Sequence, residues 1–592
     1  MDLSGLLLCL EESCPKRFYR RSNVCGFIGA FGSAISDDDV DNGLRVISHR
    51  GPDGTQAKRI GQLYLASCRL AIHPPYDDSP LQSTGNEVLA LNGEIYNFLE
   101  LTATPPVDTS SITDTNLLAR VLSIKGKTIL PALQGLFAFC FSDGQRVLLA
   151  RDRFGIKPLY YARLQKGLVF ASEMKALLSL PGLSRELDED VISSITIAGH
   201  NLFPGKTPFR QVQSLKPGHF IEYSVGEELQ EKPFALIPHP PMPGAGVTIE
   251  ANEAAERAEE LLAASVSRTV QHDPHPKALF FSGGLDSSLL LDLARRHSPV
   301  TCFVLSDRSD ADDLIEARRV TQALGVRLEE RSINETELAR EIVSYAWHFE
   351  QPIAGGAFDL FGGVAFHALA RSIGKDYKVA LCGEGADELF LGYHRLHMQP
   401  EIFAESLRNR LGAATPMVRQ LLEASHLLEQ GPLLSRAVRD LALHQGLADY
   451  HLASVDRSGM TFGLEIRPAY LDNELAAWAT SLDESALIDR NNNWTKLPLR
   501  SIAMRRFSQP GTERVAVRRK WAMPSAIELC SKKMVEQLNT VSPHRTKDEK
   551  NNLDQILMDL FVYLHVDPGC TSPPDFSLFD FVNDLRRPGR MI

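Results

Sequence analysis

A glycine-containing turn between an apolar run and a helical pattern constrains the fold of this chain most. The run ALFFS (278–282) leads into SGGLDS (282–287), and a helical pattern follows. A second apolar run, KVALC (378–382), leads in the same way into GEGADE (383–388). Because strand–turn–helix alternation is typical of a parallel sheet covered by helices, we expect an α/β domain over residues 249–545.

The turn SGGLDS has the composition of a phosphate-binding loop. Serine and glycine let backbone N–H groups approach a phosphate closely, and the positive end of a helix dipole attracts the anion. An isolated SGG would indicate only an ordinary glycine turn, but SGGxDS directly after a strand is more specific and resembles the PP-loop of ATP pyrophosphatases. Walker A loops and dinucleotide-binding loops have other spacings. The residues expected to bind ATP are Ser282, Gly283, Gly284, Leu285, Asp286, Ser287 and Gly383.

Carboxylates follow both of these strands and predict a metal site. Ligands collect at the carboxyl ends of the strands in a parallel sheet. Asp286 and Asp387 would therefore share one Mg²⁺ held against pyrophosphate, because carboxylate oxygens suit this ion. Glu384 lies between two glycines, which indicates close approach to a ligand rather than loop solvation or a helix cap.

The N-terminal part of the chain has a different pattern of apolar runs and turn residues. Residues 25–225 contain short β-rich runs separated by glycine, proline and aspartate, with helical periodicity over 113–124. These patterns predict an α+β domain rich in antiparallel sheet. The proline- and glycine-rich residues 226–248 are the expected linker. We expect residues 546–592 to form a C-terminal tail with one amphipathic helix over 553–566.

Composition and charge exclude several classes of protein. The chain has 592 residues, which is enough for several domains. Its net charge of −11 lacks the excess of basic residues that is typical of a nucleic-acid-binding protein. No apolar run approaches the roughly 18 residues of a membrane-spanning helix, so no membrane partner is expected. The nine cysteines show no CxxC spacing. Their pattern argues against both a disulfide framework and a zinc site, and favours the cytoplasm.

The motifs that surround Cys25 carry a family resemblance. A lone buried cysteine usually only packs in the core, but Cys25 occurs together with several recognisable motifs. The motifs that resemble the class II (N-terminal-nucleophile) glutamine amidotransferase domain are CGFIGAFG (25–32), HRGPDG (49–54), NGEIYN (92–97), GLFAFCFSD (135–143), RDRFGIKPLYYA (151–162) and ASEMKAL (171–177). Those that resemble the synthetase domain of glutamine-hydrolysing asparagine synthetase are SGGLDS, GEGADELFLGY (383–393) and DRSGMTFGLEIRPAYLD (456–472). The resemblance implies an N-terminal αββα sandwich of the Ntn-hydrolase type, followed by an α/β ATP-pyrophosphatase domain.

The resemblance also implies roles in a glutaminase site. Cys25 would attack the glutamine carboxamide, with its own free α-amino group as the base. Asn92 and the Gly93 N–H would stabilise the oxyanion. Arg69 would pair with the glutamine α-carboxylate, because a guanidinium matches a carboxylate fork to fork. The full glutamine-binding set would be Arg69, Asn92, Glu94 and Asp114, the last two holding the α-ammonium.

In the second domain the resemblance implies amide synthesis. Ammonia would cross a tunnel to a site where ATP adenylates a substrate carboxylate and pyrophosphate leaves. Glu384 would act as a general base for the ammonia. Lys520, in RRKWAMP (518–524), would neutralise charge on the departing pyrophosphate; otherwise it is a surface lysine in a basic run. The implied cofactors are ATP and Mg²⁺, and the partners are small molecules (glutamine, ATP and a carboxylate acceptor), an arrangement compatible with a homodimer.

Two segments depart from the family pattern. Residues 1–24 precede Cys25, so a free α-amine requires that this leader be removed, or that translation start at the Val24 codon. The family's acceptor-binding segment contains threonine and arginine, whereas residues 348–363 contain neither and offer glycines and Asp359. A dicarboxylic amino acid needs a cation for its α-carboxylate. The resemblance makes aspartate the default acceptor, whereas this segment favours another carboxylate unless a cation from elsewhere in the chain pairs with the α-carboxylate.

Two other functions stay open. An intramolecular amide synthetase, of the β-lactam or lasso-peptide type, would use the same fold and ATP chemistry. Such relatives typically lose the cysteine and the glutamine pocket, which this chain retains. A homologue whose leader blocks Cys25 would depend on free ammonia or act as a regulator, but the intact SGGLDS and GEGADE motifs argue against a non-catalytic role for the ATP half.

Overall fold

The computed structural model describes most of the chain. The described residues are 24–72, 81–84, 86–98, 100–102, 113–270, 275–353, 357–518, 526–541, 549–566 and 572–585. Residues 1–23 of the expected leader, Lys520, and the side chains of Cys25 and Asp359 lie outside this described part.

The N-terminal domain is a sandwich of two β-layers. One layer contains β1 (Val24–Phe31), β2 (Gly54–Ile60), β3 (Leu63–Arg69), β8 (Tyr160–Arg163), β9 (Leu168–Ala171) and β10 (Gln213–Ser214). The other contains β4 (Gln82–Thr84), β5 (Glu87–Ile95), β6 (Gly135–Ser142), β7 (Arg146–Arg151), β11 (His219–Ser224) and β12 (Glu231–Pro233). The layers meet where Val24 of β1 pairs with Asn92 of β5. Large apolar side chains such as Phe27 and Phe170 fill the space between them.

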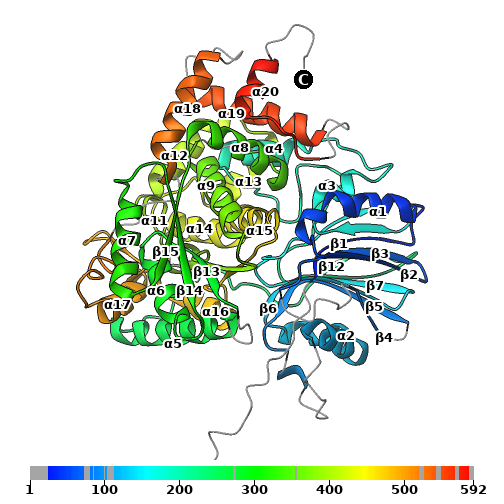
Figure 1. Ribbon diagram of the computed structural model, residues 1–592, viewed down its shortest axis with the longest axis horizontal. Coiled ribbons are helices and arrows are strands. Elements are labelled where there is room, and N and C mark those ends of the chain that lie inside the picture. Colours follow the sequence, from blue (N-terminus) through cyan, green and yellow to red (C-terminus); the bar gives the residue numbers. More distant parts are fainter. Residues whose placement is uncertain are drawn as a thin grey trace, which may run out of the picture.

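Helices cover the two outer faces of this sandwich (Figure 1). Helices α1 (Asp37–Val46) and α3 (Met174–Leu178) pack on the layer that contains β1. Helix α2 (Asp114–Lys125) packs on the other layer, because its apolar face meets β5 and β6. Thr113 caps α2 by accepting a hydrogen bond from the N–H of Asn116. The predicted αββα architecture is therefore confirmed.

The C-terminal domain is built on a parallel sheet. Its strand order is β15 (Arg327–Ser332), β14 (Val300–Ser306), β13 (Lys277–Phe280), β16 (Val379–Cys382), β17 (Glu465–Pro468). One face is covered by α5 (Ala251–Val270), α6 (Leu285–Ala294), α7 (Asp312–Leu324), α16 (Asn473–Ser481) and α17 (Leu497–Arg506). The other is covered by α8 (Glu335–Phe349), α9 (Ala357–Ile373), α15 (Ala453–Met460) and α18 (Glu528–Val541). Burial on both faces explains why β13, β14 and β16 read as apolar runs, and the predicted α/β class is confirmed.

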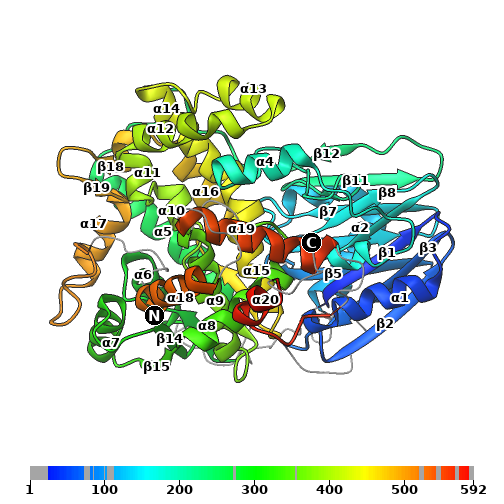
Figure 2. The ribbon, with the colours of Figure 1, turned by 90° about the horizontal axis from the view of Figure 1, so that it is seen from above.

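A further group of helices connects the two domains, which lie side by side in Figure 2. Its members are α10 (Ala386–Phe390), α11 (His394–Met398), α12 (Pro400–Arg410), α13 (Pro416–Ala424), α14 (Pro432–Leu441) and the π-helix Ala442–Leu452. Helices α12, α13 and α14 share an apolar cluster with α4 (Glu189–Ala198) of the N-terminal domain. No helix of the described residues has both the length and the apolar character needed to cross a membrane.

Two expected segments differ from the structure. Residues 231–233 of the expected linker form β12, which pairs with β11, so this part belongs to the sandwich. The expected tail forms α19 (Glu549–Phe561), the π-turn Val562–Val566 and α20 (Leu578–Leu585). Leu553, Ile556 and Phe581 are buried in the core of the C-terminal domain. Phe561 contacts Phe209 of the sandwich, with ring centroids 6.1 Å apart. The predicted helix over 553–566 therefore exists, but it is part of the core rather than of a tail.

Candidate functional site

Three motifs of the N-terminal domain meet at the start of β1. Val24 pairs with Arg69 at the end of β3 and with Asn92 in β5. The β1–β3 register shifts between Val24 and Gly26, so Cys25 occupies a β-bulge. Bulges re-aim side chains and are over-represented beside active sites. The structure thus brings Arg69 and Asn92, two of the predicted site residues, to either side of the Cys25 backbone.

Asn92 carries an unsatisfied amide. Its side chain is fully buried, and neither its nitrogen nor its oxygen has a hydrogen-bond partner among the described residues. Leaving a buried amide unbonded costs about 1–3 kcal/mol, so the site fits a ligand that completes these bonds. Gly93 follows with a φ of 116°, and a Cβ there would lie 2.0 Å from the carbonyl oxygen of Leu136. Only glycine fits this position.

The two carboxylates predicted to hold the glutamine ammonium are both buried and contact protein groups. Asp114 is the first residue of α2, and its Oδ2 accepts a hydrogen bond from the N–H of Ile95 at 3.2 Å. Glu94 Oε1 accepts from Arg467 Nη2 at 2.5 Å. Arg467 lies on β17 of the C-terminal domain, so Glu94 makes an interdomain ion pair that sequence reasoning did not predict.

A buried ion network extends this interdomain contact. Arg50, from the HRGPDG motif, donates to Glu173 at 2.9 Å and to Asp456 of the C-terminal domain at 2.8 Å. Arg457 donates to Glu350 at 2.9 Å. Burial alone would raise the pKa of Glu173, but the surrounding cations hold that pKa well below its usual value. Because removing one partner would leave a buried charge uncompensated, the network fixes how the two domains meet.

The phosphate-binding motif of the C-terminal domain connects β13 to α6. Gly283 has a φ of 66°, and a Cβ there would lie 2.6 Å from the backbone of Glu316 in α7. Gly284 is the N-cap residue of α6, so unpaired backbone N–H groups follow it. A cavity of about 260 Å³ opens here, and the predicted ATP-binding residues that line it are Ser282, Gly284, Leu285, Asp286, Ser287 and Gly383. Gly283 packs against α7 and shapes the turn.

The carboxylates predicted to bind metal lie together and share a lysine. Strands β13 and β16 are neighbours, so their carboxyl ends meet at one edge of the sheet. Lys496 Nζ lies 2.5 Å from Asp286 Oδ2 and 2.7 Å from Asp387 Oδ1. Burial lowers the pKa of Lys496, although Asp286 counteracts this shift. Asp286 Oδ1 is buried and has no hydrogen-bond partner among the described residues, which fits a site that receives Mg²⁺.

A polar group faces Glu384 across the cavity. His451 Nδ1, from the π-helix, lies 3.9 Å from Glu384 Oε2. The Tyr393 hydroxyl donates to Glu388 at 2.7 Å and lies 3.1 Å from His451 Nε2. Glu384, Tyr393 and His451 all line the cavity. The predicted general base thus lies on the cavity wall, with an ionisable histidine 3.9 Å away.

The basic run that precedes Lys520 reaches the same loop. Arg518 donates to the carbonyl oxygen of Ser282 at 2.9 Å and to Asp312 and Asp313 at 2.8 and 2.5 Å. Arg518 therefore anchors the phosphate-binding loop to the start of α7. Lys520 itself lies outside the described residues, so its predicted role stays a prediction.

Comparison with known families decides the class of the protein. A family described as "Glutamine amidotransferase domain" matches residues 24–234, and one described as "Asparagine synthase" matches residues 257–556, about half of the chain. The chain belongs to the asparagine synthase family. As an asparagine synthase family member with both domains, it is an ATP-dependent ligase that hydrolyses glutamine to obtain its nitrogen. The resemblance that the motifs indicated is confirmed.

Curated relatives of this asparagine synthase family member include two from Bacillus subtilis. Glutamine-hydrolysing asparagine synthetase 1 is 27% identical over 437 residues, which cover 70% of this chain and 67% of the relative. Glutamine-hydrolysing asparagine synthetase 2 is 27% identical over 503 residues, which cover 77% and 65%. Amidase chyE of Penicillium rubens is 29% identical over 381 residues, which cover 60% of this chain and 55% of the relative.

Several contacts at these sites were not predicted from the sequence. Lys496 stands in NWTKLPLR (493–500), outside the motifs that carry the family resemblance, and its left-handed backbone (φ 58°) leaves no signal in the sequence. Arg50, Glu173 and Asp456 lie inside recognised motifs. A charged residue without an assigned role in each of three motifs was the sequence signal that could have indicated a shared buried network.

Proposed function

We propose that this asparagine synthase family member hydrolyses glutamine at Cys25 and delivers the ammonia to an acyl-adenylate in the cavity of the second domain. The Cys25 thiol would add to the carboxamide carbon of glutamine, and its proton would pass through the α-amine to the departing ammonia. Water would then cleave the thioester to give glutamate. Asn92 and the Gly93 N–H would donate to the oxyanion, and the unsatisfied Asn92 amide supports this role.

The remaining groups would hold glutamine in place. Arg69 would bind its α-carboxylate, while Glu94 and Asp114 would bind its α-ammonium. Because Glu94 already pairs with Arg467, the bound ammonium would share this carboxylate with a residue of the synthetase domain. Glutamine binding would then act directly on the interdomain contact.

In the second domain, ATP would bind with its phosphates at the N-terminus of α6. Asp286 and Asp387 would hold Mg²⁺, which supplies charge neutralisation for the pyrophosphate. A carboxylate oxygen of the acceptor would attack the α-phosphate to form the acyl-adenylate, and Lys520 would balance charge on the departing pyrophosphate. Ammonia would then attack the acyl carbon, Glu384 would take up a proton, and AMP would leave to give the amide.

The interface offers surface suited to ammonia transfer. Leu70 and Ile72, directly after β3, form an apolar cluster with Val379 and Met460 of the second domain. Neutral ammonia passes apolar surface at little cost, whereas the ammonium ion would lose its solvation. The cluster therefore supports transfer inside the protein rather than through solvent.

The acceptor is proposed to be a carboxylate other than free aspartate. The cations among the described lining residues are Lys496, Arg500 and Arg518, besides the ionisable His451. Lys496 binds two aspartates, Arg518 binds two aspartates and a carbonyl, and Arg500 donates to the carbonyl oxygens of Thr495 and Ala516. All three are thus engaged by the protein, which leaves the α-carboxylate of aspartate without a described arginine or lysine to pair with.

The observation that carries the proposal is the Glu94–Arg467 contact, because it joins the glutamine motif directly to the synthetase domain. The test supplies glutamine labelled with ¹⁵N in its amide, ATP and a panel of carboxylates, in the presence of excess unlabelled ammonium. We expect the amide product to retain most of the label and pyrophosphate to form in equal amount. Complete dilution of the label would contradict internal transfer. Free aspartate with the highest kcat/KM, compared with aspartyl derivatives and uronic acids, would contradict the acceptor proposal.

A further inference from the structure

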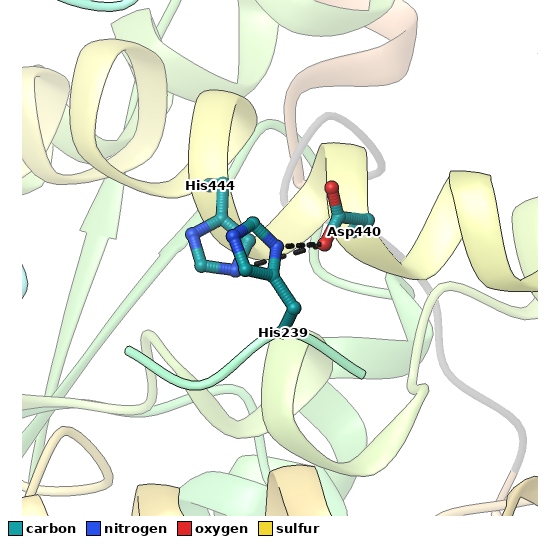
Figure 3. A group of neighbouring side chains, drawn as sticks. All are labelled: His239, Asp440 and His444. Carbon is teal, nitrogen blue, oxygen red and sulfur yellow. Dashed lines mark hydrogen bonds and ion pairs between the residues drawn. The ribbon is translucent and has the colours of Figure 1, made fainter. Parts of the chain in front are cut away.

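A group of metal-ligating side chains lies away from both sites. His239 Nδ1 is 2.7 Å from Asp440 Oδ1, and His444 Nε2 is 3.7 Å from the same oxygen (Figure 3). One ligand atom of each residue lies within 4.8 Å of the other two. The two imidazole rings are close together, with centroids 4.2 Å apart. The motifs of the glutaminase and the synthetase contain none of these three residues.

The three residues come from two segments that the proposed reaction leaves unexplained. His239 belongs to the proline-rich connection between the domains, flanked by Pro238 and Pro240. Asp440 and His444 are four residues apart on α14 and the π-helix that continues it, so they share one helical face. The connection is held against α14 next to this group, because Arg436 Nε donates to the carbonyl oxygen of Pro240 at 3.1 Å.

One ring nitrogen of His444 is available to a cation. Nε2 is buried and has no hydrogen-bond partner among the described residues. Nε2 faces Asp440 Oδ1 at 3.7 Å, a separation that is too long for a hydrogen bond and long enough for a cation to lie between the two atoms.

The distances match a tetrahedral ion. Zinc binds imidazole nitrogen and carboxylate oxygen at about 2.0–2.2 Å, so two ligands of a tetrahedral site lie about 3.3 Å apart. The observed separations of 2.7 and 3.7 Å fall on either side of this value. Neutral imidazoles with one carboxylate are also a ligand set that zinc accepts, with water in the fourth position. His239 is 66% exposed, so the ion has access from solvent.

We propose that His239, Asp440 and His444 form a zinc site. The bound ion would hold the proline-rich connection around His239 against α14 and the π-helix that follows it. The cysteine pattern argued against a zinc site made of cysteines. The ligands proposed here are two histidines and an aspartate, and His239 lies 201 residues before Asp440 in sequence, so no local motif indicates the site. The π-helix that contains His444 also supplies His451 to the synthetase cavity. Zinc at this site therefore fixes the N-terminal end of an element whose other end lines the catalytic cavity.

The test is a Co²⁺ titration of the metal-free full chain, followed by absorption between about 500 and 650 nm, where tetrahedral Co²⁺ absorbs. Excess Mg²⁺ is present to saturate oxygen-rich sites. We expect one equivalent of Co²⁺ to bind and Zn²⁺ to displace it. His239→Ala and His444→Ala should each weaken binding at least tenfold. His426→Ala is the matched control, because His426 is another exposed histidine paired with one carboxylate, Glu429, at 2.6 Å.

A second readout keeps the proposal falsifiable without relying on activity. Zn²⁺ should raise the melting temperature of the wild type and of His426→Ala, but not that of His239→Ala or His444→Ala. Zn²⁺ should also slow proteolysis of the connection around residues 239–247. Equal Co²⁺ affinity in wild type and His239→Ala, or a Zn²⁺-induced stabilisation that survives both histidine substitutions, would overturn the site.

Discussion

Glu94 and Arg467 form a fully buried ion pair across the interface between the two domains, with Glu94 Oε1 2.5 Å from Arg467 Nη2. Glu94 follows Asn92 and Gly93, the proposed oxyanion residues, on β5. Arg467 lies on β17, which pairs with β16, the strand that leads into the proposed metal-binding motif. The pair therefore joins the two proposed sites through a buried ionic contact between the domains.

Arg467→Met should destabilise the protein by about 3–5 kcal/mol, because Glu94 would be left buried and unpaired. Adding Glu94→Gln should recover part of this loss, since the double variant buries no isolated charge. Urea unfolding of both variants measures the effect. Lys206→Met, which removes the exposed pair with Asp188 at 3.2 Å, is the control and should cost less than about 1 kcal/mol. An equal, additive loss from both buried substitutions would mean that the two residues do not interact.

Asn92→Ala should lower kcat for glutamine hydrolysis about 10²–10³-fold, because an oxyanion donor is removed. Synthesis from free ammonia should be unchanged. Asn97→Ala is the matched control from the same motif, because its amide is already bonded to the carbonyl oxygen of Ala132 and the N–H of Gln134. That variant should lose stability but keep most of its glutaminase kcat. Similar kcat losses in both variants would argue for a purely structural Asn92.

Lys496→Met should lower the rate of pyrophosphate release about 10²-fold or more, with glutamine hydrolysis preserved. Without the lysine, Asp286 and Asp387 lose their shared cation, so the Mg²⁺ concentration for half-maximal rate should fall while kcat falls. Lys496→Arg should restore part of kcat. A loss of kcat with an unchanged Mg²⁺ dependence would indicate that Lys496 only supports the fold.

Stability should decline as the pH falls below about 6.5. Burial lowers the pKa of His367 and of His397 to about 3, from the usual 6.5. Between these values the unfolded chain binds protons that the folded chain excludes, so each histidine costs up to about 2 kcal/mol at pH 5 and nothing above pH 7. Urea midpoints at several pH values would show this slope, and His367→Gln should flatten it. A slope that is unchanged in His367→Gln would assign the acid sensitivity to other groups.

Features that depend on residues adjacent in sequence, such as turns and the strands before them, could be predicted. SGGLDS after an apolar run predicted both the turn at Gly284 and its place at the carboxyl end of a strand, because sequence neighbours determine both. Lys496 could not be predicted, since its importance comes from two aspartates that are more than 100 residues away in sequence. Strand β12 was assigned to the linker because three residues with a proline carry no periodic signal, and only pairing with β11 reveals it.

The central claim is that two separate sites, one at Cys25 and one at Asp286, carry the two half-reactions. Cys25→Ala and Asp286→Asn test it together, with amide formation assayed from glutamine and from ammonia and glutamate release assayed alone. Cys25→Ala should abolish synthesis from glutamine and retain synthesis from ammonia, whereas Asp286→Asn should stop pyrophosphate release and retain basal glutamine hydrolysis. Loss of ammonia-dependent synthesis in a folded Cys25→Ala protein would contradict the account.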